Sequence, residues 1–252
     1  MKFIEINENN LASEHICCSI ADKKGDNAVA LKKSWLAERL PDGLVFRKLD
    51  ARGKVFIEYL PAEKAWAPIT APDYMYIDCF WVSGQYKGQG FANRLLEQTI
   101  EDAKAKKKHG LVVLSSSKKM PFLSDPQYLK CKSFKLADTA QPYFELLYLP
   151  FVANAAIPKF KEQAKTGTDK KKGLVLYFSN QCPFTEKYAR LLEDIAQKRN
   201  ITLKLNKIID LEQAKNAPTP FTTYSLFFDG DFVTNEILSE KKFKNFLDAK
   251  GL

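Results

Sequence analysis

The chain has 252 residues, of which 45% are hydrophobic and 27% charged, with a formal net charge of +9. This length is enough for one large domain or two modest ones, and a core of that size needs no disulfide support. The N-terminal segment lacks the apolar core of a signal peptide, and no window is apolar for long enough to span a bilayer. We therefore expect a cytoplasmic protein.

The cysteines, histidines and glycines exclude several classes of site. The five cysteines are an odd number without C-x-x-C spacing, so neither a disulfide framework nor a zinc site is expected. His15 and His109 are the only histidines and lie far apart, which argues against a histidine-rich metal site or a Ser-His-Asp triad. The glycines follow neither the P-loop nor the dinucleotide-binding pattern.

The positive charge is spread over both halves of the chain. Lysines gather at 104–108, where they fit the solvated end of a helix, and at 170–172, where they fit a flexible linker. Nucleic-acid binding has no motif behind it. A non-catalytic module that binds acidic partners is an alternative, and steep loss of binding with added salt would support it.

Strands and helices alternate over the first 150 residues. Hydrophobic periodicity predicts strands at 3–6, 44–49, 54–60, 74–82, 110–114, 134–137 and 143–149, and helices at 29–40, 93–103 and 126–131. The turn Asp50–Gly53 indicates a hairpin, and Pro41 ends the first helix. The order predicts a mixed α/β sheet.

A glycine-containing turn joins the strand at 74–82 to the next helix. Such a turn leaves main-chain N–H groups unpaired at the positive end of a helix, where phosphate oxygens bind. Gly88 and Gly90 carry no Cβ, so a pyrophosphate can approach closely. The pattern Gln/Arg-x-x-Gly-x-Gly/Ala fits from Gln85 or from Lys87. We prefer Lys87, because it puts the first buried turn of the helix at residues 95 and 96.

This turn and the order of elements resemble the acetyl-CoA-binding region of the GNAT (GCN5-related) N-acetyltransferases over residues 1–150. The resemblance implies a GNAT fold, acetyl-CoA as co-substrate and no metal. It implies that the cofactor is bound by Phe80, Trp81, Val82, Lys87, Gly88, Gln89, Gly90, Phe91 and Ala92. Lys87 departs from the usual Arg or Gln, although a lysine still meets phosphate as a point charge. Main-chain N–H groups of a splayed strand at 80–82 would polarise the thioester carbonyl.

Two further residues carry acid–base roles by this resemblance. Asp78 interrupts an apolar strand and is the first choice of general base, because burial would raise its pKa. The alternatives are that it pairs with a lysine at a sheet edge, or that ordered waters carry the proton. Glu58 is a second choice, otherwise a solvated strand residue. Tyr128 is the expected acid, otherwise a packing residue, and its surroundings lack the family's glycine.

The sequence changes character at residues 151–172, which we expect to be a linker with partial helix at 158–165. Beyond it we predict strands at 173–178, 201–205, 224–228 and 232–234, and helices at 183–198, 210–216 and 239–247. This order resembles the thioredoxin fold, with Pro218 or Pro220 at the cis-proline position. The two parts together resemble GNAT proteins with a YoaP-type C-terminal domain, residues 173–252.

Cys182 lies where a thioredoxin fold carries its active-site cysteine. The dipole of the following helix would lower its pKa, whereas a buried cysteine would be inert. Thr185 replaces the second cysteine, which excludes a dithiol cycle within this site. The other cysteines, Cys17, Cys18, Cys79 and Cys131, and the aromatic run from Phe221 to Phe232 are expected in the core.

Two functions follow. The leading hypothesis is a CoA-dependent N-acyltransferase that acts on a small-molecule or peptide amine. Its C-terminal part would cover the acceptor cleft, select the substrate or mediate contacts in a homodimer. The alternative is a monothiol redox or thiol-carrier protein centred on Cys182, whose first domain binds CoA without turnover. Neither function involves a membrane.

Overall fold

The structure is a computed structural model and describes residues 2–16, 18–20 and 26–252. Its larger sheet has the described strand order β1-β2-β3-β5-β6-β8-β7, in which only β5 and β6 are parallel. The strands are β1 Phe3–Ile6, β2 Val45–Leu49, β3 Val55–Pro61, β5 Tyr74–Val82, β6 Gly110–Ser116, β7 Lys135–Ala140 and β8 Phe144–Pro150. Short strands β4 Ile69–Thr70 and β9 Lys159–Phe160 pair separately.

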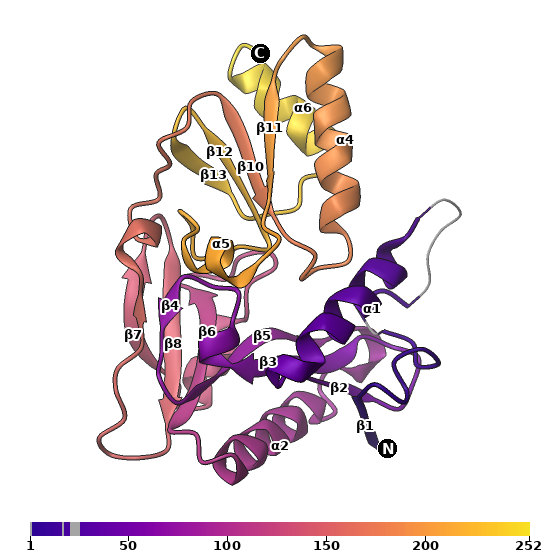
Figure 1. Cartoon of the computed structure of the whole chain (residues 1–252), viewed down its shortest axis with the longest axis vertical. Helices are drawn as coiled ribbons and strands as arrows, with labels where there is room; N and C mark the ends of the chain where they lie inside the picture. The colour runs from indigo at the N-terminus through magenta and orange to yellow at the C-terminus, as the bar shows by residue number, and fades with distance from the viewer. Residues whose placement is uncertain (1, 17, 21–25) are drawn as a thin grey trace.

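Helices cover both faces of this sheet, α1 on one and α2 on the other (Figure 1). The helices of the first part are α1 Ala28–Arg39, α2 Phe91–Ala105 and α3 Pro126–Cys131, with 3₁₀ turns η1 Leu40–Asp42, η2 Ala62–Lys64 and η3 Gly84–Tyr86. Each face of this sheet has its own hydrophobic core, and alternate residues of β5 pack into one or the other. Tyr74 and Tyr76 pack on the α1 side, and Met75 and Ile77 on the α2 side.

Strand β5 parts from its neighbour β6 halfway along its length. Their pairing ends at Ile77 and Val113, although β5 continues to Val82 beside β3. At the same point β5 has one residue more than β3, because Ile77 faces Tyr59 and Cys79 faces Glu58. Asp78 is therefore the extra residue of a bulge, a feature that re-aims side chains.

The smaller sheet has the described order β11-β10-β12-β13. Its elements are β10 Leu174–Phe178, β11 Leu203–Lys207, β12 Tyr224–Phe228 and β13 Asp231–Thr234, with helices α4 Thr185–Lys198, α5 Leu211–Lys215 and α6 Glu240–Ala249. Strand β10 is parallel to β11 and antiparallel to β12. Its Leu174 and Leu176 pack beneath α4 and α6, and Val175 and Tyr177 belong to the other core. Because β10 is buried on both faces, its residues 174–178 form a continuous apolar run.

The two sheets share one hydrophobic core. Phe227 of β12 and Phe232 of β13 pack with Phe144 of β8, and the rings of Phe144 and Phe232 lie 5.4 Å apart. The Tyr143 hydroxyl donates a hydrogen bond to Asn235 Oδ1 at 2.7 Å across the same boundary. The smaller sheet therefore has α4 and α6 on one face, and its other face, together with α5, packs toward the larger sheet (Figure 1).

The sequence-based order of elements is confirmed, the partial helix expected at 158–165 is reduced to one 3₁₀ turn, and the cis-proline position is wrong. The segment 158–165 forms strand β9 and the 3₁₀ turn η4 Glu162–Ala164, because Ile69 and Phe160 pair across β4 and β9. Neither Pro218 nor Pro220 follows a cis bond; the cis X-Pro bond of the described residues is Gln141–Pro142. No helix within the described ranges is long and apolar enough to cross a membrane.

Candidate active site

The glycine turn before α2 has the geometry of an anion seat. Gly90 is the N-cap residue of α2. Its carbonyl oxygen accepts the first hydrogen bond of the helix, from Arg94 N at 3.1 Å. The preceding amides therefore have no acceptor within the helix. Gly88 and Gly90 have φ of 76° and 78°, and a Cβ on either would meet no atom within 4 Å. This space is open to a ligand.

The other predicted cofactor residues of the turn surround this seat. Lys87 and Gln89 are exposed, and Gln89 Nε2 donates to Gln85 O at 2.6 Å. Phe91 is buried and packs edge-on against Tyr86 at 5.9 Å, which anchors the turn, and Ala92 is half-buried. The structure brings these residues together at the start of one helix.

The splayed end of β5 exposes main-chain groups. Ser83 N donates to Lys54 O at 2.9 Å, and hydrogen-bonding directions alternate along an antiparallel pair. Trp81 thus directs its N–H toward β3, and Phe80 and Val82 direct theirs toward the side that β6 has left. The sequence predicted that Phe80, Trp81 and Val82 all bind the cofactor. The alternating N–H directions separate Trp81, whose side chain is 47% exposed, from the other two residues.

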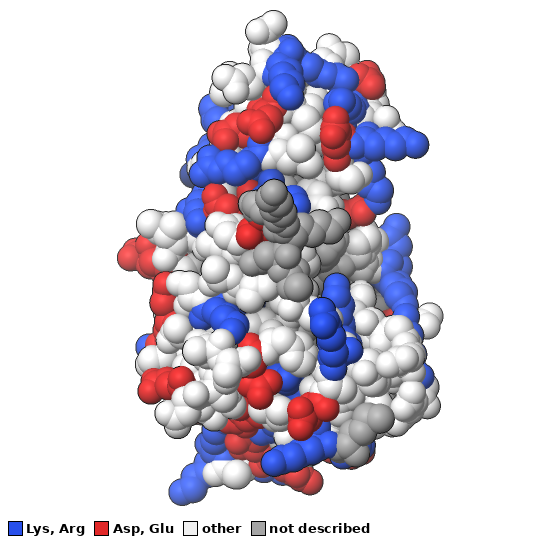
Figure 2. All heavy atoms as spheres, turned by 90° about the vertical axis from the view of Figure 1, so that its right-hand side faces the viewer, with Lys and Arg blue, Asp and Glu red and all other residues white. Residues whose placement is uncertain are grey.

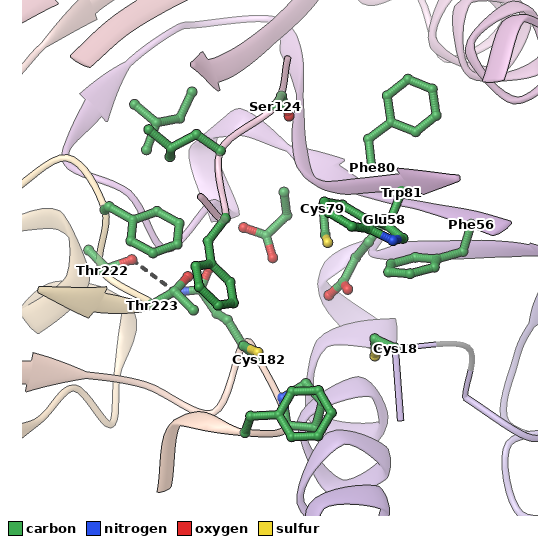
Figure 3. Close-up of a pocket in the computed structure, with 18 of the residues that line it drawn as sticks. Cys18, Phe56, Glu58, Cys79, Phe80, Trp81, Ser124, Cys182, Thr222 and Thr223 are labelled. Atoms are coloured by element: carbon green, nitrogen blue, oxygen red, sulfur yellow. Dashed lines mark hydrogen bonds between the residues drawn. The ribbon is translucent and has the colours of Figure 1, made fainter. Parts of the chain in front are cut away.

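A cavity of about 200 Å³ lies on the α1 side of this opening, between the two sheets (Figure 3). Its first wall comes from α1, β3, β5 and the 122–124 loop, and its second from the loops 181–184 and 220–223 of the C-terminal part. Figure 3 shows Glu58 and Cys79 on one side of it and Cys182 and Thr222 on the other. Asp78 and Cys182, two predicted catalytic residues, both line it.

A buried ion pair forms the floor of this site. Lys32 Nζ lies 2.7 Å from Glu58 Oε2, and both side chains are at most 1% exposed. Lys32 also donates to Gln181 O at 2.6 Å, and Trp35 Nε1 donates to Glu58 Oε1 at 3.2 Å. Burial lowers the pKa of Lys32, but the nearby acidic groups, with Glu58 the largest contributor, together raise it above its ordinary value. The expectation of a solvated Glu58 is therefore wrong, because α1 covers this strand.

Asp78 has a perturbed carboxyl group. Burial, and then the negative charge of Glu58, raise its pKa to about 7, while Lys32 acts in the opposite direction. Asp78 lies in the middle of the larger sheet, and no hydrogen bond or ion pair to its side chain occurs in the part of the chain that the structure describes. A lysine partner at a sheet edge is thus not observed. A carboxyl group that titrates near neutrality is suited to accept a proton.

Tyr128 lies on the opposite side of β5. Its hydroxyl donates to Asn93 Oδ1 of α2 at 3.2 Å, and its ring contacts Phe80 edge-on at 5.7 Å. Burial, and then the charge of Glu97, raise the pKa of Tyr128 to about 12, so the hydroxyl keeps its proton at neutral pH. The structure therefore places it beside both the splayed strand and the helix that follows the glycine turn.

Cys182 does not have the expected thiolate character. Burial raises the pKa of its thiol, and α4 begins only at Thr185, three residues later. The single Thr185 hydroxyl proton is shared between Ser179 O at 2.5 Å and Cys182 O at 2.9 Å, so this residue holds the loop. The prediction of a lowered Cys182 pKa is wrong.

The remaining cysteines differ from one another. Cys131 is exposed rather than in the core, because it ends the short helix α3. Cys18 and Cys79 are half-buried and line the cavity, and Cys17 lies outside the described residues. The described ranges contain no group of three or more His, Cys, Asp or Glu that could hold a metal ion.

The lysine clusters are engaged in local contacts. Lys106 pairs with Asp102 at 2.6 Å, and Lys171 donates to Asn206 Oδ1 at 2.7 Å. Figure 2 shows basic and acidic side chains intermingled over the face it presents. Such a surface does not favour an acidic macromolecular partner.

Sequence reasoning missed Lys32 and the second wall of the cavity. A signal for Lys32 exists, since Ala28, Lys32, Trp35 and Leu36 are the buried residues of α1 at helical spacing. A lysine within such a stripe needs a buried partner. The loops 181–184 and 220–223 carry no comparable local signal.

Two protein families and a close relative match this chain by sequence. Residues 11–119 match the acetyltransferase (GNAT) family, and residues 202–245 match the YoaP-like family. The chain is 44% identical over 249 residues to an uncharacterized N-acetyltransferase, YoaP, of Bacillus subtilis (strain 168), and the match covers 99% of each chain.

Two solved structures show a more distant similarity. A GNAT family acetyltransferase from Brucella melitensis in complex with acetyl-CoA is 11% identical, with a TM-score of 0.40 over 64% of this chain and 92% of its own. The yncA protein of Salmonella typhimurium, solved with its cofactor acetyl-CoA, is 15% identical, with a TM-score of 0.41 over 62% and 96%.

Proposed function

Because this chain belongs to the GNAT acetyltransferase family and is an acyl-CoA-dependent N-acetyltransferase, we propose that it transfers the acetyl group at the splayed end of β5. The observation that carries this assignment is that β5 and β6 stop pairing after Ile77. The opening that results has the glycine turn on one side and the cavity on the other. Acetyl-CoA would lie across the opening, with its pyrophosphate at Gly88 and Gly90. The acceptor amine would enter from the cavity.

Different residues of the chain then carry out the separate steps of the acetyl transfer. Asp78 accepts a proton from the acceptor nitrogen, directly or through a water, as that nitrogen attacks the thioester carbonyl. The N–H groups of Phe80 and Val82 stabilise the oxyanion that forms. Tyr128 donates its proton to the departing thiolate sulfur. The thioester bond breaks, an amide bond forms, and free CoA leaves.

We propose that the chain consists of a GNAT domain at 1–150, a linker at 151–172 and a YoaP-type domain at 173–252. We propose that the last has a thioredoxin-like fold, because β10 is parallel to β11 and antiparallel to β12, and helices α4 and α6 pack on one face. Its role is to complete the acceptor cavity. A cytoplasmic setting fits the unoxidised thiols of Cys79, Cys131 and Cys182.

The glycine turn can be tested with Gly90→Glu. Acetyl-CoA should raise the melting temperature of the unaltered protein, since a ligand that binds only the folded state stabilises it. In the variant this shift should vanish, because the new carboxylate would occupy the open space and repel the pyrophosphate. Gly173→Glu is the matched control, with φ of 77° and equally open space in the C-terminal part. An undiminished shift in Gly90→Glu would refute this placement.

The acid role of Tyr128 predicts a specific loss. Tyr128→Phe should lower kcat about 100-fold, within the range for general acid catalysis, and leave the Kd for acetyl-CoA within twofold. The ring and its contact with Phe80 persist in the variant. Tyr188→Phe, at a half-buried tyrosine of α4, is the control and should retain full activity. Steady-state rates with calorimetry decide, and a fully active Tyr128→Phe would exclude this role.

A further inference from the structure

The chemistry of the cavity points to a class of acceptor. Resting on the function proposed above, we infer that the acceptor is a small monoamine with an apolar, ring-sized body. The YoaP-type domain supplies the wall that selects it.

Aromatic side chains reach this cavity from both parts of the chain. Phe56 of β3 and Trp81 of β5 line it from the larger sheet, and Phe184 and Phe221 line it from the C-terminal loops. Apolar walls hold an apolar body and give little binding to a polar one. The acceptor therefore buries a hydrocarbon surface against both parts.

The volume of the cavity limits the size of that body. An apolar cavity of roughly 150 Å³ accommodates benzene. The cavity here measures about 200 Å³, which suits one aromatic ring or a branched aliphatic group with a short aminoalkyl chain. A folded protein substrate could introduce no more than one side chain or its N-terminal residue.

The charges of the cavity limit the acceptor to one cationic group. Glu58 is neutralised by Lys32 at 2.7 Å, so Asp78 is the carboxylate left to meet an ammonium group among the lining residues described. Lys54 lies above the Phe184 ring at 5.8 Å and repels a further cation. A polyamine would bring positive charges that apolar walls leave unpaired, which is costly.

The selecting wall is held in place before any ligand arrives. Gln181 O accepts from Lys32 at 2.6 Å, and Gln181 Nε2 donates to Thr222 Oγ1 at 2.9 Å. Thr222 Oγ1 in turn donates to Trp66 O of the N-terminal part. The two C-terminal loops are thus tied to each other, to α1 and to the loop that carries Trp66, and their shape can discriminate between amines.

The test uses the full chain, acetyl-CoA and four amines: 2-phenylethylamine, isopentylamine, spermidine and an alanine-initiated tripeptide. Chromatography of the acetylated product gives kcat/KM for each. Burial of a ring predicts that 2-phenylethylamine exceeds spermidine by about 10–100-fold, with isopentylamine between them. Preference for spermidine or the tripeptide would overturn the inference and leave the acetyltransferase assignment intact.

Variants of the wall test the contribution of the C-terminal part. Phe184→Ala and Phe221→Ala should each raise KM for 2-phenylethylamine about 10-fold, with the Kd for acetyl-CoA unchanged. Phe246→Ala, at a half-buried phenylalanine of α6 away from the cavity, is the control and should leave KM unaltered. Unchanged KM values in both wall variants would overturn the inference.

The two levels of the proposal fail differently. If calorimetry shows that acetyl-CoA binds but no amine of the panel is acetylated, the acceptor class is wrong. If acetyl-CoA does not bind to the folded protein, the proposed function itself is wrong.

Discussion

Asp78→Asn should lower kcat by about 10²–10⁴-fold, the usual contribution of a general base, while the Kd for acetyl-CoA stays within twofold. Asparagine keeps the shape of the side chain in the bulge of β5 and removes its ability to accept the proton. Steady-state kinetics with 2-phenylethylamine and calorimetry with acetyl-CoA measure the two quantities. Asp194→Asn, at an exposed position of α4, is the matched control and should behave as the unaltered protein.

The pH dependence of the rate gives this prediction a distinct signature. A base must be deprotonated, so kcat/KM of the unaltered protein should rise with pH through about 7, the pKa of Asp78. The acidic limb should disappear from the residual activity of Asp78→Asn. Persistence of a limb at the same pH in the variant would assign it to another group and remove Asp78 from the mechanism.

Asp78 also predicts how stability depends on pH. Its pKa is raised from 3.8 in the unfolded chain to about 7 in the folded protein, so the folded state binds more protons between these values. The stability that Asp78 contributes is complete below about 3.8 and is lost as pH rises through about 7. Asp78→Asn should therefore raise the melting temperature more at pH 8 than at pH 5. An equal change at both pH values would contradict the raised pKa.

The parts of the site that depend on local sequence were predictable. The turn with Gly88 and Gly90 is defined by residues next to one another, and its conformation follows from their freedom at positive φ. Asp78 was identifiable because a carboxylate interrupts an apolar strand. Elements of the larger sheet were predictable for the same reason, since periodicity is a property of each segment alone.

The parts that depend on packing between distant segments were not predictable. The pKa of Cys182 is set by burial beneath residues far along the chain, and burial outweighs the dipole of a helix that begins three residues later. Glu58 appeared solvated because its partner Lys32 lies on another element. The second wall of the cavity exists only because both sheets share one core.

That shared core makes the Lys32–Glu58 pair the most sensitive polar contact in the site. Lys32→Met should lower the free energy of unfolding by about 3–5 kcal/mol at pH 7, because it leaves the Glu58 carboxylate buried without a counter-charge. The loss of the bond to Gln181 O should also loosen the selecting wall and raise KM for the acceptor. Denaturant unfolding and steady-state kinetics measure the two effects.

A second variant separates the charge from the packing. In Lys32→Met/Glu58→Gln the carboxylate that Lys32 neutralised is absent, and the amide oxygen introduced at position 58 can still accept from Trp35 Nε1, so most of the lost stability should return. KM should stay high, because Gln181 O still lacks its donor. Lys33→Met, beside it on α1, removes a lysine that donates to Ala12 O at the surface and should cost less than about 1 kcal/mol. A double variant as unstable as Lys32→Met would show that the lysine stem, not its charge, supports the fold.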